Sequence, residues 1–307
     1  MRSLPTGPVL GVFLLTAAAM ACGRAEEGPR PDPPDAALRV PEAGPPADAA
    51  AAGPEKAAEA AADDGLARHG APPRSVDLAK GAPVFAFVEV DPGSWDFRFF
   101  RLDSACRGTA CEAGEGEARI RFPAAFVVPV EKRPVAPGTI VVADSGHGAD
   151  AAVVESAAAE RIEVRWIAPF LLGNPAAAKA PTSSVSADAA MPRPEGVRPL
   201  APVARRTPSG GWVYREVVAT FGDHALVFAP LGGPDEIEVV PSASLVSIPA
   251  RPAVAAGSRV HAVWGPLLLR PAVVKAMAHH DAVFAVDFGS GDTGEVGAGA
   301  LIASLPQ

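Results

Sequence analysis

The sequence lacks any long segment in which apolar residues recur with the 3.6-residue period of a helix. It contains no P-loop and no glycine fingerprint for dinucleotides. Its basic residues are scattered, and its formal net charge is -8 at pH 7. A protein that binds nucleic acid needs a basic face. We therefore expect no helical domain, no nucleic-acid partner and no cofactor.

Arrangements of residues that would support catalysis or metal binding are also scarce. The turn Asp144–Gly148 contains Asp, Ser and His, but a nucleophilic triad converges from distant parts of a fold. The neighbours in His279–Asp281 would point to opposite faces of a strand, which disfavours chelation of one ion. Asp287 and Asp292 lack the regular spacing of a calcium loop. We interpret all three as turns and predict no catalytic or metal-binding residue.

The N-terminus has the three parts of a secretory signal peptide. A positive start at Met1–Ser3 precedes the apolar run Val9–Leu15 and the small residues Ala17–Ala21. The apolar run is too short for a comfortable transmembrane helix. We predict a signal peptide over residues 1–21. The simplest alternative to a lipoprotein signal is a plain signal peptide cut near Ala21.

The end of this segment, Ala19-Met20-Ala21-Cys22, resembles the lipobox of bacterial lipoproteins. The resemblance implies that Cys22 carries a lipid that anchors the chain to the cell envelope. The following residue is Gly23 and not Asp, which by the family's rule favours the outer membrane in a cell that has one.

Only three cysteines are present, and lipidation of Cys22 would leave Cys106 and Cys111. These two lie close together in a polar loop. Since an exported compartment is oxidising, we predict a disulfide between them. A redox pair and a metal pair are the alternatives, although a structural metal usually needs four ligands.

Two stretches are rich in Pro and Ala. Residues 22–78 have almost no large apolar side chains and cannot offset the entropy of ordering, so we predict a disordered tether. Residues 173–208 are predicted to be a linker. The folded regions would then be residues 79–172 and 209–307, each of a size that supports a single core.

Within these regions, short runs of β-branched and aromatic residues alternate with turn residues. Examples are Pro83–Val90, Trp95–Leu102, Arg259–Trp264 and Val283–Phe288. This pattern predicts an all-β protein built from small barrels or sandwiches.

The second half of the chain echoes the first at an offset of about 120 residues, which suggests a duplication. Chance similarity between strands rich in Ala and Val is the alternative. We predict two duplicated halves, each a pair of small β units. The matching residues are Gly138 and Gly257, Ala152–Val154 and Ala272–Val274, Val164 and Val286, Pro123–Val128 and Pro241–Val246, and Arg133-Pro134 and Arg251-Pro252.

The segment Ala256–Leu305 carries a further resemblance. Gly257 precedes a strand with Val260 and Ala262, and the segment then contains Ala272–Val274, Val286–Gly289 and Glu295-Val296. This order resembles a Tudor or agenet-type SH3-like barrel, and it covers about one barrel. It implies tandem SH3-like barrels that recognise a protein segment. The family's cage for methylated Lys or Arg often uses an aromatic residue where this chain has Leu267–Pro271.

Aromatic residues on a barrel rim can contact a ligand, although core packing is their commoner role. We select Trp264, Phe284 and Phe288 as candidates for ligand-facing aromatics. Our functional hypothesis is an exported, lipid-anchored, non-enzymatic protein that binds a protein or another envelope component. The alternative is an exported, hydrolase-like enzyme whose site cannot be recognised from sequence. A deep pocket that gathers acids or His with shifted pKa values would favour the enzyme, and shallow grooves would favour the binding protein.

Overall fold

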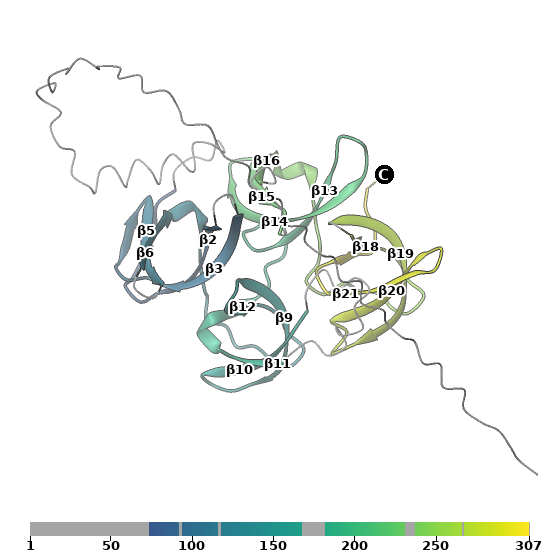
Figure 1. Cartoon of the computed structure of the whole chain (residues 1–307), viewed down its shortest axis with the longest axis horizontal. Coiled ribbons are helices and arrows are strands. Elements are labelled where there is room, and N and C mark those ends of the chain that lie inside the picture. The colour runs from purple at the N-terminus through teal and green to yellow at the C-terminus, as the bar shows by residue number, and fades with distance from the viewer. Residues whose placement is uncertain are drawn as a thin grey trace, which may run out of the picture. The chain divides into compact units, whose positions relative to one another are not determined.

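The computed structural model describes residues 74–91, 94–115, 118–167, 182–230, 237–265 and 267–306. The predicted signal peptide, Cys22, the tether up to residue 73 and the first part of the predicted linker lie outside the described residues. The fold is all-β, with strands joined by turns and one-turn 3-10 helices (Figure 1). Within the described ranges, no helix combines the length and the apolar character needed to span a membrane.

The same order of strands occurs four times, and we call these parts the first to fourth β-modules. The first β-module contains β2 (Pro83–Asp91), β3 (Ser94–Arg101), β5 (Ala110–Glu115), β6 (Ala118–Pro123), η1 (Ala124–Phe126) and β7 (Val127–Pro129). The second contains β8 (Ile140–Asp144), β9 (Ala149–Ala157), β10 (Arg161–Trp166), β11 (Thr182–Ser186), η3 (Ala187–Ala189) and β12 (Ala190–Pro192). The third contains β13 (Pro202–Arg206), β14 (Trp212–Phe221), β15 (His224–Phe228), β16 (Ile237–Pro241), η5 (Ser242–Ser244) and β17 (Leu245–Ser247). The fourth contains β18 (Arg259–Trp264), β19 (Leu268–Ala278), β20 (Val283–Gly289), β21 (Asp292–Gly297) and β22 (Leu301–Ile302).

Each β-module is an antiparallel meander whose last strand returns to pair with its first. The returning pairs are β2 with β7, β8 with β12, β13 with β17 and β18 with β22. In the first β-module, β3 connects to β5 through the bridge between Leu102 and Ala113. A further short pair, β1 (Val76–Leu78) with β4 (Cys106–Gly108), lies beside this module and includes the last residues of the predicted tether.

The second part of the predicted linker is strand and not linker. Residues 182–206 contain β11, η3, β12 and β13. The alternation Ser-Val-Ser in β11 places Val185 in the core, with 8% of its surface exposed. Pro192 and Pro202 lie at a strand end and a strand start, where the missing N–H group costs no ladder bond. The Pro and Ala content therefore hid strands that a two-residue period would have indicated.

The second and fourth β-modules match in detail at the strands whose sequences echo. The N–H group of Gly138 donates to the Val154 carbonyl at 2.7 Å, and the N–H group of Gly257 donates to the Val274 carbonyl at 2.8 Å. Val164 pairs with Val154, and Val286 pairs with Val274. Both pairs lie next to a bulge in the second strand.

The side chain at each bulge forms an ion pair with the third strand. In the second β-module Glu155 pairs with Arg165 at 2.7 Å. In the fourth β-module Lys275 pairs with Asp287 at 2.9 Å. The equivalent positions therefore carry an ion pair of reversed sign.

Hydrophobic clusters cross the module boundaries. One contains Ile140 and Val153 of the second β-module, Tyr214 of the third and most of the fourth. Another contains Phe87 of the first and Phe228 of the third, with ring centroids 4.7 Å apart. The third and fourth β-modules also share a sheet through the pairing of β14 with β19.

The predicted disulfide between Cys106 and Cys111 is confirmed, with their Cα atoms 5.0 Å apart. Both cysteines are buried in the core of the first β-module beside Phe100 and Phe122. The disulfide therefore belongs to a packed core and not to a solvated loop.

Candidate functional site

The three aromatic residues proposed to face a ligand lie on the fourth β-module. Phe284 is 1% exposed and packs in the core, so it offers no surface to a ligand. Phe288 is 9% exposed and lines a groove together with His261. Burial lowers the pKa of His261. Trp264 is partly buried, and the guanidinium of Arg270 lies 4.4 Å from its ring centroid. The structure does not bring these aromatics together into one binding surface.

In two of the turns that contain candidate catalytic or metal-binding residue types, the polar side chains form hydrogen bonds within the turn. Ser145 donates through Oγ to the Gly148 carbonyl at 3.1 Å, and Asp144 accepts from the Gly146 N–H group at 2.9 Å. Asp287 accepts from the Gly289 N–H group at 2.8 Å as well as pairing with Lys275. No group of three His, Cys, Asp or Glu residues that could hold a metal occurs in the part of the chain that the structure describes.

The turn between β19 and β20 is strained. His279, His280 and Asp281 have φ angles of 52°, 58° and 58°, in the left-handed region that residues with a side chain rarely adopt. Runs of such residues cost free energy and persist where surrounding contacts hold them. Here His280 contacts the second β-module, with its Nε2 atom 3.4 Å from Glu155 Oε2.

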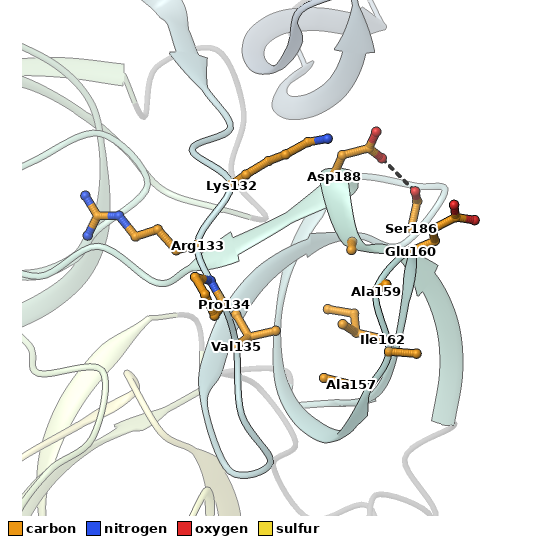
Figure 2. Close-up of a pocket in the computed structure, with 12 residues that line it drawn as sticks. Lys132, Arg133, Pro134, Val135, Ala157, Ala159, Glu160, Ile162, Ser186 and Asp188 are labelled. Carbon is orange, nitrogen blue, oxygen red and sulfur yellow. Dashed lines mark hydrogen bonds between the residues drawn. The ribbon is translucent and has the colours of Figure 1, made fainter.

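A groove of about 800 Å³ lies on the second β-module. One wall is the segment Lys132–Val135, which leads into the module, and the other is the turn Ala157–Glu160 between β9 and β10 (Figure 2). Val135 contributes apolar surface to the groove, and Arg133 and Glu160 lie on opposite sides. Ile162, which also lines the groove, is buried in the core of the module. The groove therefore mixes apolar and charged surface.

A polar cluster lines part of this groove. Asp188 accepts a hydrogen bond from Ser186 Oγ at 2.6 Å and forms an ion pair with Arg101 of the first β-module. The hydrogen bond from Ser186 and the charges of Arg101 and Lys132 lower the pKa of Asp188. Since this carboxylate is stabilised in its charged form, it is poorly suited to act as a general acid or base near neutral pH.

The fourth β-module has a groove of about 640 Å³ at the equivalent place. Its walls are Arg251–Ala255, which match the segment at Arg133-Pro134, and Asp281 of the turn between β19 and β20. The two grooves are therefore formed by corresponding elements of the second and fourth β-modules.

Sequence reasoning missed a buried polar network between β-modules. Arg193 follows β12 and is 6% exposed. Its Nη2 atom donates to Tyr214 Oη at 2.9 Å and to Glu216 Oε1 at 3.3 Å, and Tyr214 Oη donates to the same Glu216 oxygen at 2.6 Å. Its Nη1 atom donates to the Ala298 carbonyl at 3.3 Å. No sequence signal marked it, because Arg193 lay in the predicted linker.

A second acid lies near this network. Burial raises the pKa of the Asp96 carboxyl to about 6, and the charges of Glu216 and Asp150 act in the same direction. Burial also raises the pKa of Glu216, against the effect of Arg193. Asp96, Asp150 and Glu216 belong to the first, second and third β-modules and line neither of the two equivalent grooves. We interpret them as part of the packing between modules.

No known protein family matches this sequence, and no curated protein matches it.

Proposed function

We propose that this protein is an exported, non-enzymatic binding protein of the cell envelope, anchored by a lipid at Cys22. Its β-modules are SH3-like barrels in two duplicated halves, and the groove of the second β-module binds a surface of a partner protein. The matched hydrogen bonds, bulges and ion pairs of the second and fourth β-modules support the duplication. The returning last strand in every module supports the barrels.

The observation that carries the proposal is a contact made by the elements that form the equivalent groove in the fourth β-module. There Arg251 donates a hydrogen bond to the Gly138 carbonyl, and the neighbouring turn places His280 against Glu155. The same elements thus already hold a protein surface within this chain. In the second β-module the corresponding turn, Ala157–Glu160, is exposed and lines an open groove.

The enzymatic alternative lacks a supporting observation. The acids with raised pKa values, Asp96 and Glu216, are engaged by the Phe97 N–H group and by the network of Arg193 and Tyr214. The groove instead contains Asp188, whose pKa is lowered. A groove that mixes apolar and charged surface suits a partner protein better than an acid–base reaction.

A photo-crosslinking residue placed at Ala158 in living cells tests the groove. We expect a discrete protein adduct from Ala158, and its loss when Ala159→Arg fills the groove. Ser209, exposed on the third β-module, serves as the matched control position and should give no adduct. Absence of any protein adduct at Ala158 in a folded, membrane-associated protein would refute the proposal.

The anchor is tested separately. Cys22→Ala should release the chain from the membrane fraction and abolish incorporation of labelled palmitate. Retention of both properties in this variant would show that the lipid anchor is not at Cys22.

A further inference from the structure

The contact between the second and fourth β-modules shows what the elements around the fourth module's groove bind. Arg251, which lines this groove, contacts the turn that leads into β8, because it donates to the Gly138 carbonyl. His280, in the turn beside the groove, faces Glu155 at the bulge of β9. A side chain at Gly138 would place its Cβ atom 3.5 Å from both Arg251 Nη2 and the Cβ atom of His280. Arg251 and His280 therefore fit a glycine turn beside a charged bulge.

The fourth β-module presents the same pair of features on its own surface. Gly257 occupies the turn that leads into β18, and Lys275 occupies the bulge of β19. Among the residues that the structure describes, none comes within 4 Å of a Cβ atom built on Gly257. The Lys275 side chain is 56% exposed. The glycine turn and the charged bulge, which in the second β-module contact the fourth, are thus exposed on the fourth β-module itself.

The charges at the two unfilled surfaces are complementary. Inside the chain, a His in the turn faces Glu155 at the bulge. In the second β-module the charged residue of the turn is Glu160, and in the fourth the residue at the bulge is Lys275. Both members of the pair differ from those inside the chain, and a docked arrangement would bring the Glu160 carboxylate to the Lys275 ammonium group.

We propose that the groove of the second β-module docks the fourth β-module of a second copy of this chain. Arg133 then donates to the Gly257 carbonyl, as Arg251 does to Gly138, and Glu160 faces Lys275. This inference rests on the proposed function of the groove as a protein-binding site. Arg133 gives up its ion pair with Glu131, in which both side chains are more than 60% exposed; exposed pairs contribute little to stability.

The contact joins two different surfaces, so the assembly runs head to tail. Such a contact closes into a ring if the rotation between copies allows it, and otherwise continues as a filament. In either case the mass of the particle rises with protein concentration. Anchoring to a membrane would raise the local concentration of copies and favour the contact.

The test is sedimentation of the full chain in detergent over a range of concentrations. We expect reversible self-association that Glu160→Lys weakens about threefold to tenfold, with the same effect from Lys275→Glu, since each change makes like charges meet. The double variant Glu160→Lys with Lys275→Glu should recover the wild-type affinity. Glu163→Lys, an equal change of charge at an exposed residue outside the groove, is the matched control and should leave association unchanged.

A chain that stays monomeric throughout, or single variants that associate like the wild type, would overturn the inference. Failure of the double variant to recover affinity would do the same. A groove adduct at Ala158 that contains a different protein, together with a monomeric chain, would refute self-docking while supporting the proposed function. Tryptophan fluorescence of every variant confirms that it is folded.

Discussion

At the scale of single residues, Arg193 is a charged side chain buried between β-modules. It is almost fully buried, and Tyr214, Glu216 and the Ala298 carbonyl receive its hydrogen bonds. A Cβ atom at Gly299 would lie 2.4 Å from Arg193 Nη1, so the guanidinium also requires a glycine beside it. Removal of one partner from a buried ion pair leaves the other charge without compensation.

We therefore expect Arg193→Met to reduce the free energy of unfolding by about 3–5 kcal/mol. The exposed Arg161, which donates to Ser184, provides a control, and Arg161→Met should cost less than about 1 kcal/mol. Urea denaturation of the three proteins measures the difference. Equal midpoints for the two variants would show that the network contributes no more than a surface contact.

Asp96 makes stability depend on pH in a defined direction. Its folded-state pKa is about 6, above the ordinary value of 3.8, so the folded state binds the proton more tightly than the unfolded state. The contribution of this carboxyl therefore falls as the pH rises from 3.8 towards about 6.

Asp96→Asn keeps the acceptor for the Phe97 N–H group but removes the charge. We expect the variant to be more stable than the wild type above pH 6 and equally stable below pH 3.8. Thermal unfolding across this range gives the comparison. A difference that persists at the acid end would show that the effect comes from packing and not from titration.

At the scale of elements, one turn recurs before the first strand of every β-module. Its third residue has positive φ in each case: Gly81 at 77°, Gly138 at 84°, Leu200 at 66° and Gly257 at 88°. Leu200 adopts this conformation without being glycine, and burial of its side chain at 2% exposure offsets the cost. The turn sets where each meander begins.

A substitution at Gly257 would measure the cost of positive φ separately from any steric clash, because a Cβ atom there meets no other atom within 4 Å. Gly257→Ala should reduce the free energy of unfolding by about 1–2 kcal/mol. Gly108 has similar open space but no positive φ, so Gly108→Ala should have little effect. Chemical denaturation of both variants tests this, and a large loss at Gly108 would contradict the reasoning.

At the scale of the whole molecule, the shared clusters couple the β-modules. Side chains of the second, third and fourth modules form one cluster, and side chains of the first, second and third form another. A module that loses a neighbour exposes part of its own core. We therefore expect the four modules to unfold together.

Each β-module contains one tryptophan: Trp95, Trp166, Trp212 and Trp264. Four variants would each replace one of these residues by Phe. Subtracting the fluorescence of a variant from that of the wild type during thermal unfolding gives the signal of the tryptophan that was replaced, and so of its module. The four difference signals should share the midpoint of the transition seen by circular dichroism. A separate midpoint for one module would show that it folds independently.

The all-β class, the Cys106–Cys111 disulfide and the positions of most strands could be predicted from the amino-acid sequence. This was possible because strand patterns and turn residues are local, with a period of two and glycine where φ is positive. The prediction was wrong at residues 182–206, which were assigned to a linker because of their proline and alanine content. The short alternation of polar and apolar residues that indicates a strand there was overlooked. Proposals about residues 1–73, including Cys22, stay predictions of the sequence.

Features that depend on residues distant in the chain could be identified only in the folded molecule. The network of Arg193, Tyr214 and Glu216, the raised pKa of Asp96 and the contact of His280 with Glu155 all join different β-modules. The two equivalent grooves likewise need a segment before one strand to meet a turn between two others. Burial and charge pairing arise from packing, and no local pattern in the sequence specifies which modules pack together.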